Sequence, residues 1–153
     1  MLFVCAMTTK SFDDLLDEVD ETFYGRNDYY ELAMQFMIKI QFQIKAYLPI
    51  EAYPFVDHAK LFWEQSSESR TQEMTEKMYE MRSLAWKVAD KHLQGSVDKA
   101  KWRIIISVFY PKLDDHPGEV IDMFVENVRK IADVEQQMIS ALNDTFLQPP
   151  NAI

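Results

Sequence analysis

Three histidines and a large number of carboxylates are the side chains of this sequence that could do metal or acid–base chemistry. His58, His92 and His116 lie far apart. None of them belongs to a Glu-x-x-His or His-Glu-x-x-His pattern, which di-iron bundles and zinc proteases use. The cluster Asp114-Asp115-His116 has metal-binding residue types, but its position before Pro117 is typical of a helix start. We therefore expect no metal site and no cofactor.

Nucleophilic and phosphate-handling motifs are equally absent from the sequence. Cys5 lies in an apolar N-terminal stretch, where a low thiol pKa is hard to produce. Three widely separated glycines cannot form a phosphate-binding loop. The acidic run over residues 13–21 is typical of a solvated helix face, whereas acid–base catalysis needs a desolvated carboxyl group. The sequence predicts no catalytic residue and favours a protein that is not an enzyme.

The spacing of apolar residues predicts an all-α fold, an irregular helical bundle of five to six helices. Ser11 and Ser96 have the position of helix N-caps, Pro54 has the position of a first helical residue, and Gly25 and Gly95 have the position of helix stops. The segment from Asp28 to about Leu48 is apolar on nearly every side, which is typical of a central helix. A strand over residues 104–110 is the alternative to a helix there. Apolar positions from Ile121 to Phe146 predict a long C-terminal helix of about 27 residues, or about 40 Å.

Length and composition predict one helical domain over residues 9–147. We expect a flexible N-terminal extension over residues 1–8, with Met7 as a more natural start, and a disordered tail over residues 148–153. A single cysteine excludes an intramolecular disulfide, and no apolar run is long enough to span a membrane. These features predict a cytoplasmic protein without a membrane segment.

The net charge of −9 is distributed unevenly along the chain. Residues 81–112 hold seven basic residues and two acidic ones, with Trp86 and Trp102 among them. One hypothesis is therefore a polyanion-binding module that uses this segment. We favour internal pairing of the segment with acidic helices, and the overall acidity makes nucleic acid an unfavourable partner.

The acidic N-terminal segment is the strongest candidate for a binding surface. Carboxylates there can steer a basic partner, and neighbouring tyrosines can supply contact area. The predicted partner-binding residues are Asp13, Asp14, Asp17, Glu18, Glu21, Tyr24, Tyr29 and Tyr30. The sequence thus favours a non-enzymatic protein-binding module, an acidic inhibitor or immunity-type protein that blocks a basic macromolecular partner.

Two alternatives to this function stay open. One is a small helical-bundle enzyme or a metal- or ligand-binding protein that uses the histidines and carboxylates. The other is a homodimer, in which a row of methionine side chains packs against a second copy of the chain. This row consists of Met74, Met78 and Met81.

Overall fold

The computed structural model describes residues 10–112 and 116–147. Over these ranges the chain forms seven α-helices and no strand, so the predicted all-α fold is confirmed and the number of helices is higher than five to six. The predicted N-terminal extension and C-terminal tail lie outside the described residues. The helices are α1 (Phe12–Phe23), α2 (Tyr29–Gln43), α3 (Tyr53–Glu64), α4 (Gln72–Ala89), α5 (Val97–Ile106), α6 (Pro117–Ile131) and α7 (Glu135–Leu142).

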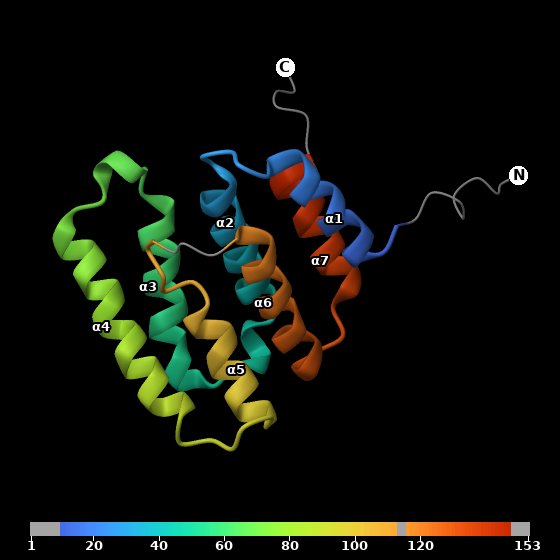
Figure 1. Ribbon diagram of the computed structural model, residues 1–153. Coiled ribbons are helices and arrows are strands. Elements are labelled where there is room, and N and C mark those ends of the chain that lie inside the picture. Colours follow the sequence, from blue (N-terminus) through green and yellow to red (C-terminus); the bar gives the residue numbers. More distant parts are fainter. Residues whose placement is uncertain (1–9, 113–115, 148–153) are drawn as a thin grey trace, which may run out of the picture.

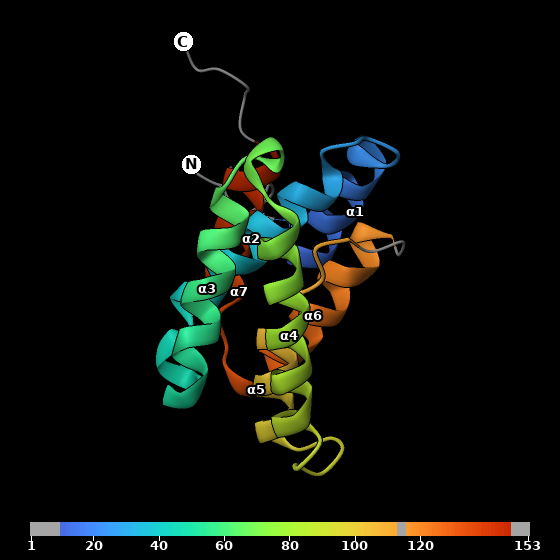
Figure 2. The same cartoon turned by 90° about the vertical axis from the view of Figure 1, so that its left-hand side faces the viewer.

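Helix α2 lies at the centre of the bundle, as its apolar sequence predicts. It packs against α3, α6 and α7. The side chains of Met34, Phe36, Met37 and Ile40 have no exposed surface. Figure 1 shows α4 at one edge of the bundle and α1 with α7 at the other, while α5 packs between α4 and α6. Figure 2, which views the molecule from the left-hand side of Figure 1, shows α3 and α4 side by side.

Local signals in the sequence place several helix ends correctly. The Ser11 hydroxyl accepts a hydrogen bond from the Asp14 backbone N–H at 3.1 Å, and the Ser96 hydroxyl accepts one from Lys99 N–H at 3.1 Å. Each bond satisfies a backbone donor that has no partner inside the helix. Gly25 directly follows the C-cap of α1 with a φ of 81°, a conformation that glycine adopts without steric cost, so this predicted helix stop is confirmed. Gly95 also has a positive φ, 84°, but it does not end α4, because α4 already ends at Ala89.

The predicted long C-terminal helix is wrong, because the chain breaks between α6 and α7. Ala132 is extended, with φ −158° and ψ 152°, although the sequence has neither glycine nor proline at this point. The break turns the Val134 side chain into the core, where it is 8% exposed. It also lets α6 pack on α5 while α7 packs on α1. Tertiary packing therefore overrides the local helical preference.

The regularly spaced methionine side chains of α4 point toward the protein core. Met78 is fully buried and Met74 and Met81 are half-buried against the core. This spacing therefore leaves little area for a second copy of the chain. The alternative of a strand over residues 104–110 is also wrong. Helix α5 runs to Ile106, and the Trp63 indole N–H then holds the Val108 carbonyl at 2.8 Å.

No helix in the described part of the chain combines the length and the apolar character that a membrane crossing requires.

Candidate functional site

The predicted binding residues of α1 lie mostly on its outer side. Phe12, Leu16, Val19 and Phe23 fill the core, and this leaves the acidic positions turned outward. Asp13, Asp14, Asp17 and Glu21 are exposed. Glu18 is half-buried and forms an ion pair with Lys10. The amphipathic spacing of α1 thus presents a row of carboxylates to solvent.

The three predicted tyrosines have different surroundings. Tyr24 is 71% exposed just after α1. Tyr29 is 1% exposed, so the prediction that it contacts a partner is wrong: its ring packs on Phe23 and Phe146. Tyr30 is half-buried, and its hydroxyl donates to the Tyr110 carbonyl at 2.6 Å. Of the three, Tyr24 alone offers most of its surface to a partner.

Asp20 is the centre of a polar cluster that joins α1, α2 and α6. Its Oδ1 accepts a hydrogen bond from the Tyr29 hydroxyl at 2.9 Å and lies 2.6 Å from His116 Nε2. Burial, followed by this bond and the Asp20 charge, raises the pKa of Tyr29 above its usual value, which keeps the phenol neutral. A Cβ at Gly118 would lie 2.5 Å from Asp20 Oδ1, so glycine permits this close approach.

The cluster also orders the exposed tyrosine. The rings of Tyr24 and His116 lie 5.3 Å apart. The sequence predicts Asp20 on a solvated face and His116 at a helix start, and it does not predict that the two side chains meet. They are 96 positions apart in the chain, and no local pattern links them.

Helix α6 runs antiparallel beside α1 and extends its acidic surface. Asp20 of α1 meets His116 at the start of α6, and Asp13 meets Arg129 in the last turn of α6 at 3.4 Å. These two contacts join the helices near both of their ends, and Figure 2 shows α1 and α6 on the same side of the molecule. We call this surface the acidic face and define it as Asp13, Asp14, Asp17, Glu21, Glu119, Asp122 and Glu126.

Most carboxylates of the acidic face have no cation within ion-pair distance in the described residues. Asp13 has Arg129, and Asp14 lies close enough to Lys10 for their charges to interact, but Asp17 and Glu21 form no ion pair with any residue in the described ranges. The same holds, within those ranges, for Asp122 and Glu126 of α6. The surface therefore carries a concentration of negative charge that the fold leaves uncompensated.

The three histidines lie in different parts of the structure and contact different residues. His58 stacks on Phe109 with a centroid separation of 6.5 Å, and His92 lies 4.0 Å from Asp98. Burial, together with the Lys77 charge, lowers the pKa of His58. No group of three or more potential ligands among histidine, cysteine, aspartate and glutamate comes together in the residues that the structure describes.

We expected the basic segment 81–112 to pair with acidic helices, but most of its basic side chains form no ion pair within the described residues. Within the described residues, Lys99 has an acid within ion-pair distance, Asp90 at 3.6 Å. Arg82 instead lies over the Tyr110 ring at 4.3 Å. Trp102 is buried at 4% exposure, whereas Trp86 lines a cleft between α5 and α6.

Comparisons of the chain with protein-family models, curated proteins and solved structures found no match. What its surfaces bind must therefore be inferred from its own residues.

Proposed function

We propose that this chain is a non-enzymatic protein-binding module whose acidic face holds and blocks a basic surface of another protein. The observation that supports this proposal most directly is the set of exposed carboxylates on α1 and α6 that lack cationic partners in the described residues. Acidic inhibitors and immunity-type proteins work in this way. A cytoplasmic location is part of the proposal, because the single cysteine fits a reducing compartment.

Electrostatics argues for a basic partner. Neighbouring carboxylates on one surface repel each other, and a cationic partner relieves this repulsion as it binds. A concentrated negative field also steers a basic protein toward the face and raises the rate of association. Surface acids distributed for solubility alone would be interspersed with bases, whereas Asp14, Asp17 and Glu21 follow one another along one helix.

Tyr24 supplies the apolar contact that charge alone lacks. Tyrosine side chains often account for a large part of interface binding energy, because they combine contact area with a hydroxyl and lose little conformational freedom. Tyr24 is 71% exposed and lies at the end of the acidic row of α1. Its contact with His116 limits its motion before a partner arrives.

The proposal is tested by reversing charges in the middle of the helices. The face variant is Asp17→Lys, Glu21→Lys and Glu126→Lys, which avoids the first turns where acids stabilise a helix. The control variant is Glu68→Lys, Glu76→Lys and Glu80→Lys, three exposed acids on and before α4 with the same change of charge. Each immobilised protein is incubated with an extract of its native cells, and captured proteins are identified by mass spectrometry.

We expect the wild-type protein and the control variant to capture the same basic protein, and the face variant to lose at least nine-tenths of it. Circular dichroism should show equal helix content for all three proteins. Equal capture by the face variant would contradict the proposal, and so would a captured partner without a basic surface.

A further inference from the structure

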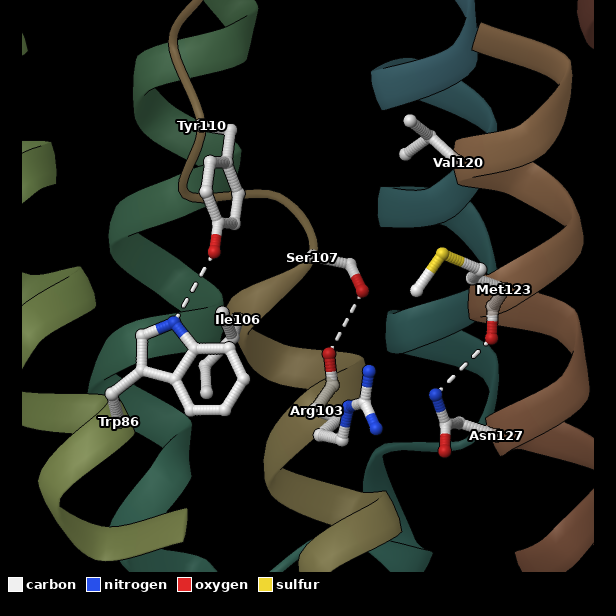
Figure 3. A pocket seen from close by; sticks show the side chains of 8 residues that line it. All are labelled: Trp86, Arg103, Ile106, Ser107, Tyr110, Val120, Met123 and Asn127. Carbon is white, nitrogen blue, oxygen red and sulfur yellow. Dashed lines mark hydrogen bonds between the residues drawn. The ribbon is translucent and has the colours of Figure 1, made fainter. Parts of the chain in front are cut away.

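A cleft between α5 and α6 lies on the other side of α6 from the acidic face. It has a volume of about 200 Å³, and its walls come from α4, α5, α6 and the segment after α5. Figure 3 shows Trp86 and Tyr110 on one side of the cleft and Val120, Met123 and Asn127 of α6 on the other side. Arg103 of α5 lies between the two sides. Most of its lining is apolar, which is typical of a ligand site with a few placed polar groups.

The aromatic wall of the cleft is held in a fixed position. The Trp86 indole N–H donates to the Tyr110 hydroxyl at 3.2 Å. Arg82 lies over the Tyr110 ring, with its Cζ 4.3 Å from the ring centroid. Across the cleft, Met123 is 55% exposed although it is a large apolar side chain. These side chains form a place for an apolar group of a ligand.

Arg103 supplies a cation that the protein does not use internally. The chain carries 25 acidic residues, yet no carboxylate of the described residues lies within ion-pair distance of Arg103. Its side chain is half-buried, so its guanidinium is partly shielded from water. A guanidinium offers five N–H donors and pairs best with a planar or tetrahedral oxyanion.

Asn127 is a second polar group that the fold leaves incompletely used. It is 6% exposed, and its Nδ2 donates to the Met123 carbonyl at 3.1 Å. Its Oδ1 has no hydrogen-bond partner in the described part of the chain. The Oδ1 atom keeps some accessible surface, so it can accept a hydrogen bond from water or from a donor group of a molecule in the cleft.

The cationic end of the cleft continues into a neighbouring recess. This recess has a volume of about 90 Å³ and shares Arg103 and Asn127 with the cleft. It adds Lys99 and Lys130, together with the N-terminal turn of α5. Arg103 and Lys130, together with Lys99, which also pairs with Asp90 at 3.6 Å, therefore lie at one end of a hollow whose other end is apolar.

We infer that the cleft binds a small molecule in which an anionic oxygen group is attached to an apolar body. The anionic group pairs with Arg103 beside Lys99 and Lys130, and the apolar body lies against Trp86 and Met123. A volume of 200 Å³ corresponds to about seven water molecules, which suits a small aromatic or branched aliphatic acid. This inference does not depend on the acidic face.

Nuclear magnetic resonance can test this site with defined probes. The protein has three tryptophans, and their indole N–H signals can be assigned with single Trp→Phe variants. The probes are 3-phenylpropanoate, 2-phenylethyl phosphate and the uncharged 3-phenylpropanamide. The variants are Arg103→Gln, and as a matched control Lys101→Gln, which removes a charge from the same helix outside the cleft.

We expect at least one anionic probe to shift the Trp86 signal saturably, while the signals of Trp63 and Trp102 stay in place. The stronger of the two anions identifies the head group. The amide should bind at least tenfold more weakly, and Arg103→Gln should weaken anion binding at least tenfold, whereas Lys101→Gln should change it less than twofold. The inference is overturned if neither anion shifts Trp86 at about 10 mM. Equal binding of the amide in the wild-type protein overturns it as well, whatever the variants do.

Discussion

Arg70 shows how a single residue joins three elements of this fold. Its guanidinium makes two bonds to the Glu31 carboxylate of α2, at 2.9 and 2.5 Å, and donates to the Phe62 carbonyl of α3 at 3.1 Å. It also lies over the Trp63 ring at 4.7 Å. Only 11% of the side chain is exposed. Arg70 thereby fastens the connection between α3 and α4 to the central helix.

We predict that Arg70→Lys destabilises the protein by about 2–4 kcal/mol, because an ammonium group cannot reproduce two parallel bonds and a ring contact. The matched control is Arg26→Lys. Arg26 pairs with Asp28 at the surface, where both side chains are about half exposed, and its replacement should cost less than about 0.5 kcal/mol. Urea unfolding measures both values. Equal effects of the two replacements would show that the buried contacts of Arg70 contribute nothing extra.

At the scale of the elements, the break between α6 and α7 is fixed from both sides. Arg129, in the last turn of α6, donates to both oxygens of Glu135 in the first turn of α7, at 2.8 and 2.9 Å. The hydrogen bond from Arg129 is the largest cause that lowers the pKa of Glu135 below its ordinary value of 4.5, and burial opposes it. The ion pair thus bridges the three residues that leave the helical path.

The direction of this pKa shift sets a pH dependence. A carboxyl group whose pKa is lower in the folded protein stabilises the fold above its unfolded value, and that stabilisation is lost as the pH falls through the folded pKa. We predict that Glu135→Gln lowers the free energy of unfolding by up to about 1 kcal/mol at pH 7, since Glu135 is partly exposed. The difference from the wild-type protein should close as the pH falls below 4.5.

Asp133→Asn provides the control for this prediction. Asp133 lies in the same break, is exposed and forms no ion pair within the described residues. Denaturant unfolding at pH 7 and at about pH 3 should show no comparable pH-dependent difference for it. If the Glu135→Gln difference persisted unchanged at the lower pH, the Arg129 pair would not be its cause.

Some ends of the helices could be predicted from the sequence, and others could not. Ser11, Ser96 and Pro54 set helix starts through contacts with their own neighbours, and these were predicted correctly. The break at Ala132 was not predicted, because the apolar spacing continues through it. Its cause is the packing of Val134 and the pairing of Arg129 with Glu135, which depend on the assembled bundle.

In the candidate site too, some features could be predicted from the sequence and others could not. Helical periodicity correctly placed Asp13, Asp14, Asp17 and Glu21 in solvent, because the apolar positions of α1 define its buried side. It could not distinguish the surroundings of Tyr24, Tyr29 and Tyr30. The burial of Tyr29 depends on Phe146 near the other end of the chain, and on the pairing of Asp20 with His116.

At the scale of the whole molecule, α6 separates two surfaces of opposite character. The side toward α1 carries the acidic face, and the side toward α5 carries the cleft with Arg103 and Lys130. The uneven distribution of charged residues along the sequence therefore produces an uneven distribution of charge over the surface of the folded protein. Such a separation orients the protein as it approaches a basic partner, because the cationic side is repelled while the acidic face is attracted.

In the proposed complex a partner covers the acidic face beside Tyr24, and hydroxyl-radical footprinting can detect this directly. Tyr24 precedes α2 and is 71% exposed, whereas Tyr47 follows α2 and is 51% exposed. Both should therefore be oxidised in the free protein. With the captured partner bound, we predict that oxidation of Tyr24 falls several-fold while that of Tyr47 is unchanged. Protection of Tyr47, with Tyr24 oxidised as fast as in the free protein, would contradict the claim.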